Sequence, residues 1–193
     1  METDQDRLLI DRLRSGDNTA VAEIRTRYQP ELQLFCRRMV YNETLAEDIV
    51  QDVLLKCCKT ETAGLPAGSL RGWLYQVARN RSIDELRRMK PDVRLSAAQS
   101  ESHLWANAAV PVDPTSTPAG KAIKADRVRR VQLAIDAMDD GLREVVILYF
   151  FQGLSRSEVA EAIGLTLAGT KARLSKATRE LRRRLQADRK SVV

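Results

Sequence analysis

The chain has 193 residues, with 32 Lys and Arg side chains against 26 Asp and Glu, and its formal net charge is +6. This length allows one medium domain or two small ones, and a hydrophobic content of 44% excludes a fully disordered chain. No stretch approaches the ~20 apolar residues of a membrane span, and the polar N-terminal sequence METDQDR does not predict a secretion signal.

The cysteine and histidine content argues against a secreted scaffold and against common catalytic chemistry. Three cysteines (Cys36, Cys57 and Cys58) form an odd set without metal-binding spacing, which favours a reducing, cytoplasmic setting. Of the adjacent pair, Cys57 is best interpreted as a small buried hydrophobic residue. The chain has one histidine, His103, and no glycine-rich phosphate loop or nucleophile motif. We therefore expect no enzyme activity, no cofactor, no metal and no small-molecule substrate.

The N-terminal segment predicts two helices. Leucines recur at helical spacing between residues 8 and 13, and Gly16 is expected to end this first helix. Asp17 or Asn18 then caps a second helix, whose apolar residues recur every three or four positions. Pro30 lies inside that pattern, where it should kink or restart the helix.

A third predicted helix carries an acidic face. Asn42 is its expected cap, and Leu45, Ile49 and Val53 form its apolar stripe. The opposite face presents the acidic residues Glu43, Glu47, Asp48 and Asp52, together with Gln51. Their spacing matches no calcium loop. The face is therefore either a docking surface for a basic protein partner or an ordinary solvated surface.

A fourth predicted helix combines aromatic and basic residues. Ser69 is its expected cap, and Trp73 and Tyr75 precede a polar, basic stretch at 78–88. Aromatic rings beside basic groups suit stacking on single-stranded bases, although Trp73 also fits the buried stripe of the helix. Asn80 and Asp84 are four residues apart and share a face, which suits a base edge as well as ordinary helix polarity.

The middle of the chain predicts a linker. Residues 91–120 hold four of the six prolines and are rich in Ser, Thr and Ala. They lack sustained periodicity, and only a weak short helix is indicated at 101–108. We therefore expect a flexible connection between an N-terminal and a C-terminal domain.

Positive charge is concentrated after the linker. Residues 121–193 hold 16 basic and nine acidic side chains, a net charge of +7, whereas residues 1–90 are near neutral at +1. Such density in one segment indicates an anionic polymer as partner, or else a solvated basic helix end. The run VVILYFF at 145–151 suits a buried strand or a helix, and we predict a helix because nothing nearby offers a strand partner.

The strongest local pattern is a helix-turn-helix at 155–174. Ser155 and Glu158 form a capping-box signature, Gly164 suits the tight turn, and Thr166 caps the second helix. The start of that second helix would enter a DNA major groove, presenting outward Ala168, Lys171, Ala172, Ser175 and Lys176. The alternative is a plain helical hairpin with solvated lysines.

The order of these motifs resembles a known family. Region 2 of bacterial sigma factors is similar to LLIDRLRSGDNTAVAEIRTRY, LAEDIVQDVLLK and LRGWLYQVARNRSIDELRR, and region 4 is similar to DDGLREVVILYFFQGLSRSEVAEAIGLTLAGTKARLSKATREL. With only a linker between them, the chain resembles the extracytoplasmic-function group of the sigma-70 family. That resemblance implies an all-α fold of two small helical domains, 1–90 and 121–193, joined by the flexible linker 91–120.

The resemblance also implies a function in transcription initiation and a set of partners. Such proteins bind core RNA polymerase, at the β′ clamp helices and the β flap, and direct it to promoter DNA. Many are held inactive by an anti-sigma factor, which we expect here too. Docking on the clamp helices would fall to Glu47, Asp48, Gln51 and Asp52.

Two further sets would contact DNA. The melted minus-ten strand, with one base flipped into a pocket, would be held by Asn80, Arg81, Ser82, Asp84, Arg87 and Arg88. The recognition helix would read the minus-thirty-five element with Lys171, Ala172, Ser175 and Lys176. Contacts with the DNA backbone would come from Ser155, Arg156, Arg173 and Arg179.

The sequence departs from the family pattern in three places. Gly169-Thr170 stands where Thr-Val is common, Ala172 lacks a frequent hydroxyl, and Cys57-Cys58 replaces an apolar–aromatic pair. The alternative functions are a stand-alone helix-turn-helix regulator that never engages polymerase, and an adaptor of two helical domains. The acidic third helix favours the polymerase partner over both.

Overall fold

The computed structural model describes residues 2–59, 64–66, 68–89 and 118–190, and every regular element in these ranges is helical. Before the gap lie α1 (Glu2–Arg14), α2 (Thr19–Val40), α3 (Glu43–Lys59) and α4 (Leu70–Arg88). After it lie α6 (Pro118–Asp136), α7 (Asp140–Val146), the π-helical turn η3 (Ile147–Phe151), α8 (Arg156–Ile163) and α9 (Leu167–Lys190). The predicted all-α fold is confirmed. The predicted linker and its short helix at 101–108 lie outside the described residues, except for 118–120, which begin α6.

The predicted caps form as hydrogen bonds. Asn42 Oδ1 accepts from the Leu45 N–H at 2.9 Å, and Ser69 Oγ accepts from the Gly72 N–H at 3.1 Å. At the start of α2 it is the Asp17 carboxylate that accepts, from the Thr19 N–H at 2.8 Å. Each bond satisfies a backbone donor that a helix start leaves free, so these boundaries follow from local chemistry.

Two predictions inside helices need correction or refinement. Pro30 does not restart α2, which is continuous from Thr19 to Val40 because the buried side chains of Tyr28 and Leu32, on either side of it, pack into the core. The run at 145–151 is helical as predicted, but it widens into η3, where the Gln152 N–H reaches the carbonyl of Ile147 at 3.0 Å. Such π-helical turns are rare in proteins.

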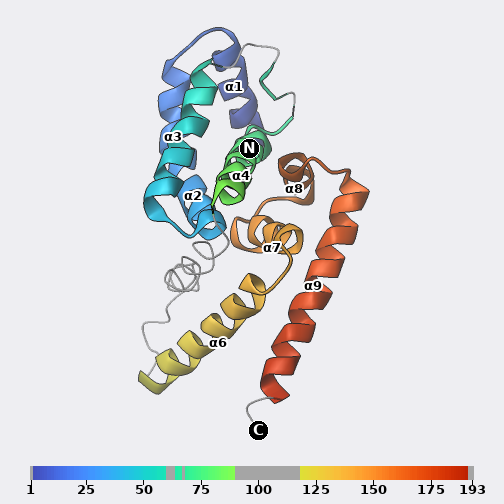
Figure 1. Ribbon diagram of the computed structural model, residues 1–193. Helices are drawn as coiled ribbons and strands as arrows, with labels where there is room; N and C mark the ends of the chain where they lie inside the picture. Colours follow the sequence, from blue (N-terminus) through green and yellow to red (C-terminus); the bar gives the residue numbers. More distant parts are fainter. Residues whose placement is uncertain (1, 60–63, 67, 90–117, 191–193) are drawn as a thin grey trace.

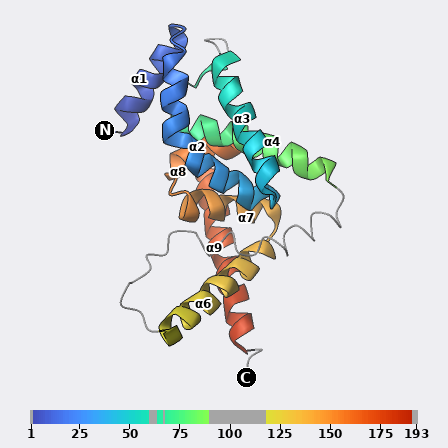
Figure 2. The ribbon, with the colours of Figure 1, turned by 90° about the vertical axis from the view of Figure 1, so that its left-hand side faces the viewer.

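The two halves of the chain lie against each other. Helices α2, α3 and α4 pack together, and α8 packs on α4 while α9 packs on α7 and α8 (Figure 1). Helices α6 and α9 pack on each other and extend away from the α1–α4 group (Figure 2). One hydrophobic cluster therefore runs through residues of both halves, from Leu32 on α2 to Leu148 on η3 and Ile163 on α8.

Candidate nucleic-acid and protein interfaces

The acidic face of α3 is fully presented to solvent. Ala46, Ile49, Val50 and Val53 are buried and fix the helix on its neighbours. The opposite face is exposed at all four predicted docking residues, Glu47, Asp48, Gln51 and Asp52. Among the described residues, no group of acidic, cysteine or histidine side chains is arranged to hold a metal ion.

An apolar residue that the sequence reading missed joins this face. Leu55 lies one turn after Gln51 and is 50% exposed. The sequence indicates its exposure only through helical spacing, which places Leu55 on the acidic face of the helix and not on the buried apolar face. An apolar contact ringed by charges is typical of a protein-docking surface.

The polar end of α4 presents part of its predicted DNA-contact set. Asn80, Asp84, Arg87 and Arg88 are exposed, and Arg81 is half-buried. The side chains of this end pair with one another, because Arg87 lies 3.6 Å from Asp84 and Arg88 lies 2.9 Å from Glu85. These surface pairs are weak and can exchange for phosphate.

Ser82 does not belong to this surface. Its side chain is buried, and its hydroxyl donates to the carbonyl of Ala78 at 2.8 Å. It lies on the inner side of α4, four residues after Ala78, which is also buried. Ser82 is therefore inaccessible to a DNA strand in this arrangement, and its contact with the minus-ten strand stays a prediction.

The two aromatic residues of α4 are core residues. Trp73 and Tyr75 are both buried, and the Tyr75 ring meets Phe35 edge-on with the ring centroids 5.1 Å apart. Burial raises the pKa of the Tyr75 hydroxyl, which donates to Gln152 Oε1 at 3.1 Å. Neither ring is available for stacking on bases, so that interpretation is also corrected.

The helix-turn-helix forms as predicted. Ser155 and Glu158 make both bonds of the capping box, and Gly164 ends α8 with a φ of +67° that favours glycine. Thr166 Oγ1 then accepts from the Gly169 N–H at 3.1 Å, which fixes the start of α9. The turn holds the two helices together and points the N-terminal end of α9 outward.

The predicted recognition residues are presented to solvent. Those that are exposed are Ser155, Arg156, Lys171, Ala172, Ser175, Lys176 and Arg179, and Arg173 is partly buried. Arg156 lies over the Tyr149 ring, 5.8 Å from its centroid. Phe150, beside it on η3, is 55% exposed, and both aromatic residues line a surface pocket with Lys171 and Ser175. The sequence pattern predicted only a helix over this run and did not single out Phe150.

Thr170 behaves differently from its neighbours on α9. Its side chain is fully buried, and its hydroxyl has no hydrogen-bond partner among the described residues. A buried hydroxyl without a partner is unfavourable, since it has lost its water. Thr170 therefore fills an apolar position with a polar side chain.

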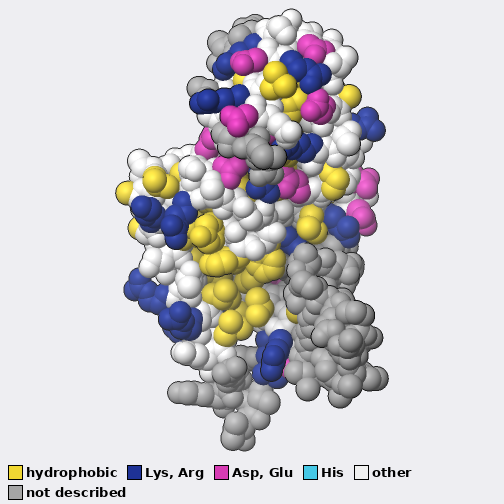
Figure 3. All heavy atoms as spheres, turned by 180° about the vertical axis from the view of Figure 1, so that it is seen from behind, with side chains coloured by type: hydrophobic (Ala, Val, Ile, Leu, Met, Phe, Trp, Pro, Cys, Tyr) yellow, Lys and Arg dark blue, Asp and Glu magenta, His cyan; other side chains and the backbone are white. Residues whose placement is uncertain are grey.

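Basic and apolar groups adjoin on the C-terminal half. Figure 3 shows a patch of apolar side chains on the back of the molecule, with Lys and Arg side chains beside it. Leu133 on α6, which is 55% exposed, lines a cleft with Arg129, Arg130 and Arg184. No described helix has the length and apolar character that a membrane crossing requires.

Two of the three cysteines are buried. Cys36 and Cys57 are buried and Cys58 is exposed, so the interpretation of Cys57 as a packing residue is confirmed. Burial raises the pKa of both Cys36 and Cys57 to about 12. A thiol with so high a pKa is unreactive at neutral pH.

Comparison with known sequences identifies both halves. The profile of sigma-70 region 2 matches residues 24–91, and that of sigma-70 region 4 matches residues 129–181. The ECF RNA polymerase sigma factor SigW of Bacillus subtilis (strain 168) is 26% identical over 177 residues, which cover 92% of this chain and 95% of SigW. SigK of Mycolicibacterium vanbaalenii, also named an ECF RNA polymerase sigma factor, is 30% identical over 148 residues, covering 76% of this chain and 71% of SigK.

Two solved structures share the fold. The structure of CnrH in complex with the cytosolic domain of CnrY superposes with a TM-score of 0.62 at 24% identity, covering 95% of this chain and 98% of CnrH. The sigma factor RpoE from Bartonella quintana, crystallised with the anti-sigma factor NepR, gives a TM-score of 0.57 at 22% identity, covering 86% and 97%.

Proposed function

Since this chain belongs to the extracytoplasmic-function sigma factors of the sigma-70 family, we propose that it binds core RNA polymerase and directs promoter-specific transcription initiation. In this role α4 reads and holds the melted minus-ten element, while α9 binds the minus-thirty-five element. The relatives are named as sigma factors, which are regulatory subunits without catalysis of their own.

The observation that carries the proposal is the exposed basic face on a capped helix-turn-helix. Residues 171–190 hold nine basic and two acidic side chains, and Lys171 and Lys176 project from the first turns of α9 into solvent. A positive face at the N-terminal end of a recognition helix suits the major groove, where lysine donates to guanine and to phosphate. Ser175, which lies between these two lysines in the sequence, can contact either a base or the DNA backbone.

The exposed acidic face of α3 supports the polymerase contact. A surface of four adjacent exposed polar residues (Glu47, Asp48, Gln51 and Asp52) with Leu55 beside them suits a basic helical partner such as the β′ clamp helices. We propose that the C-terminal domain makes the second polymerase contact, with the β flap. The minus-ten contacts of the proposal are the α4 residues that remain accessible: Asn80, Arg81, Asp84, Arg87 and Arg88.

An antagonist protein is a further proposed partner. CnrH was solved with the cytosolic domain of CnrY, and the Bartonella RpoE with the anti-sigma factor NepR. This chain shares their fold, and we propose that an anti-sigma factor binds it and holds it inactive. The localisation that fits this cycle of partners is the cytoplasm.

Run-off transcription with core polymerase tests the proposal. Adding the protein to core enzyme on a pool of genomic fragments should give transcripts with discrete start sites, and core enzyme alone should give none. The double variant Lys171→Ala/Lys176→Ala should lose the transcripts that depend on a minus-thirty-five element. If the protein shifts duplex DNA but never yields a promoter-dependent transcript, it is a stand-alone regulator instead.

A further inference from the structure

The contact between α4 and α8 joins the polymerase- and minus-ten-binding half of the chain to its helix-turn-helix half. We propose that this closed arrangement is a self-inhibited state of the free chain, held by an interdomain latch that opens before the two promoter elements are bound together. The latch consists of Arg79 and Gly72 on α4 and of Glu144 and Glu161 on the C-terminal half. The inhibitory role rests on the proposed function.

An ion pair between a buried carboxylate and a partly buried guanidinium forms the first part of the latch. Two nitrogens of the Arg79 guanidinium donate to the carboxylate of Glu144 on α7. Nε donates to Oε1, and Nη2 donates to Oε2 at 3.2 Å. The side chain of Glu144 is 4% exposed, so Arg79 takes the place of water at a buried carboxylate. Breaking a buried pair strands a charge, which makes the contact hard to lose by small fluctuations.

A close helix approach forms the second part. A Cβ atom at Gly72 would lie 2.8 Å from Glu161 Oε2 and 3.3 Å from Glu161 Cβ, so a larger residue would push the Glu161 side chain out of this contact. Glycine inside a helix costs about 1 kcal/mol relative to alanine, and α4 carries that cost at this contact. Glu161 Oε2 also accepts from the Ser69 N–H at 3.3 Å, and burial raises the pKa of the Glu161 carboxyl.

Two further polar contacts join the N-terminal and C-terminal halves along the seam, which is the interface between these halves around the contact of α4 with α8. The Arg71 guanidinium donates to the carbonyl oxygen of Gln152 at 2.7 Å while also pairing with Glu31 at 2.7 Å. The Tyr41 hydroxyl donates to Asp136 Oδ1 at 2.6 Å. Tyr41 adopts a left-handed φ of 53°, a conformation that bulky residues rarely hold unless their surroundings fix it.

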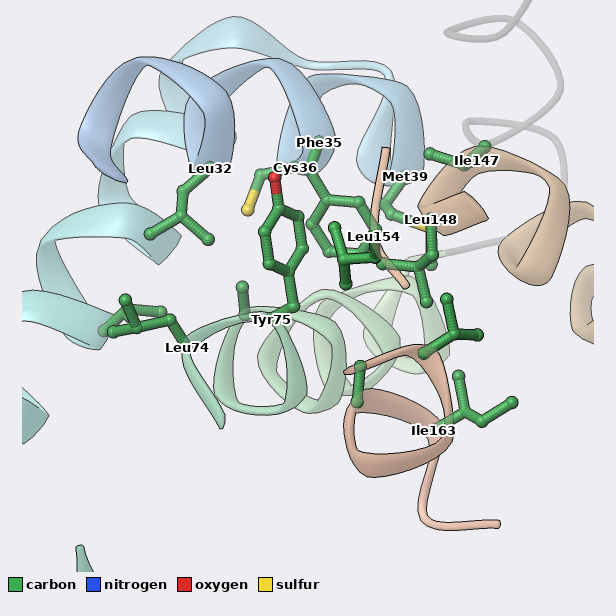
Figure 4. Close-up of a cluster of buried hydrophobic side chains, with 14 of the residues drawn as sticks. Leu32, Phe35, Cys36, Met39, Leu74, Tyr75, Ile147, Leu148, Leu154 and Ile163 are labelled. Carbon is green, nitrogen blue, oxygen red and sulfur yellow. The ribbon is translucent and has the colours of Figure 1, made fainter. Parts of the chain in front are cut away.

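The seam encloses apolar side chains from both halves. Figure 4 shows Phe35 and Met39 of α2 and Tyr75 of α4 grouped with Leu148, Leu154 and Ile163 of the C-terminal half. All six are buried. An apolar interface with bonded polar groups around it resembles a stable contact more than a transient encounter between tethered domains.

The closed arrangement cannot serve both promoter elements. The minus-ten and minus-thirty-five elements are named for positions about 25 base pairs apart. That separation is about 85 Å along a duplex at about 3.4 Å per base pair. Helix α4, with 19 residues, spans only about 28 Å, and α8, which leads directly into α9, lies against it. Arg79 is adjacent in sequence to the predicted DNA contact Asn80, and in the closed arrangement its guanidinium is already paired with Glu144. The halves must therefore separate before both elements are read.

A disulfide across the seam tests the latch. The double variant Gly72→Cys/Glu161→Cys, made with Cys58→Ser, places two Cβ atoms near the separation that disulfides require. In the full-length chain, oxidation should form an intramolecular disulfide and lower run-off transcription with core polymerase at least about tenfold, because the open fraction falls. Dithiothreitol should restore it. The oxidised chain should still shift a minus-thirty-five duplex, since Lys171 and Lys176 are exposed in the closed state.

Single variants Gly72→Cys and Glu161→Cys, each with Cys58→Ser, are the matched controls and should not respond to oxidation. If the locked chain transcribes as well as the reduced chain, or if no intramolecular disulfide forms, the latch is overturned while the proposed function stands. If the wild-type chain gives no transcript with core polymerase, the proposed function fails, and the inhibitory role fails with it, whatever disulfide forms.

An opening variant provides the opposite readout. Glu144→Gln removes the charge that holds Arg79, so the radius of gyration from X-ray scattering should rise and transcription at limiting protein should increase about threefold or more. Circular dichroism should show unchanged helix content. If neither the radius nor the transcript yield changes, Glu144 is not part of a latch.

Discussion

Arg81 on α4 donates to Asp52 on α3 at 2.8 Å, which joins a residue of the proposed minus-ten surface to one of the proposed polymerase surface. Arg81 also pairs with Glu85 at 2.8 Å. The two surfaces are thus adjacent and share a charged group. A polymerase contact that takes up Asp52 releases Arg81 toward the melted strand, so docking and strand binding are expected to be coupled.

Charge reversal on α3 is expected to weaken polymerase binding. Asp48→Arg and Asp52→Arg should each raise the Kd for core polymerase about tenfold, because like charges would then face the basic partner. Fluorescence anisotropy of labelled protein with core enzyme measures this. Asp11→Arg, an exposed acidic residue on α1, is the control and should leave the Kd unchanged. Equal losses in all three variants would point to a general charge effect and not to a docking face.

The positions of helices and caps could be predicted from the sequence because their causes are local. Asn42, Ser69 and Thr166 each bond a backbone N–H three residues ahead, and such bonds leave a readable pattern. The packing of α8 on α4 could not be predicted in this way. Gly72 and Glu161 are far apart in the chain, and a glycine that permits close approach looks in the sequence like any other helix glycine.

The candidate sites were predictable to different degrees for the same reason. Exposure of Lys171, Lys176 and the α3 acidic residues follows from helical periodicity. Ser82 and Tyr75 are polar or amphipathic residues whose burial depends on which neighbours arrive from other parts of the chain. Phe150 is exposed on the π-helical turn η3, whose residue spacing differs from the α-helical periodicity on which the sequence pattern rests.

Removing single charges from the recognition helix should lower the salt dependence of DNA binding. Lys171→Ala and Lys176→Ala should each reduce affinity for a minus-thirty-five duplex, and a lost phosphate contact should decrease the slope of log K against log salt by about 0.9. Gel shifts at several salt concentrations measure both. Arg127→Ala, on the exposed surface of α6, is the matched control. Slopes that do not change for either lysine would exclude phosphate contact by these side chains.

The same substitution at two glycines is expected to have opposite effects. Gly169→Ala should stabilise the chain by about 0.5 kcal/mol, because the added Cβ lies in the first turn of α9 and meets the nearest atom, Thr166 Oγ1, at 3.3 Å. Gly164→Ala should destabilise it by about 1 kcal/mol, because φ is +67° there. Urea unfolding followed by circular dichroism gives both values. A destabilised Gly169→Ala would mean that the Thr166 cap cannot move aside.

Thiol labelling should distinguish the three cysteines. With a thiol reagent at pH 8, the native chain should react rapidly at Cys58 alone, because Cys36 and Cys57 are buried and their pKa is raised to about 12. All three should react in urea. The raised pKa also means that stability falls as the pH rises from about 9 toward 12, where unfolded thiols ionise and native ones do not. Rapid labelling of Cys57 in the native chain would contradict this packing of α3.

Replacing Thr170 with valine should stabilise the protein. The two side chains have nearly the same shape and helix propensity, and the Thr170 hydroxyl is buried without a partner among the described residues. Removing it should raise the free energy of unfolding by about 1 kcal/mol, or the Tm by about 2–4 °C in a chain of this size. Thr178→Val is the matched control, because its hydroxyl donates to the Leu174 carbonyl at 2.9 Å and its loss should give no gain. If Thr170→Val is the less stable of the two, the Thr170 hydroxyl has a bond in solution, and α9 then sits differently on α7 and α8.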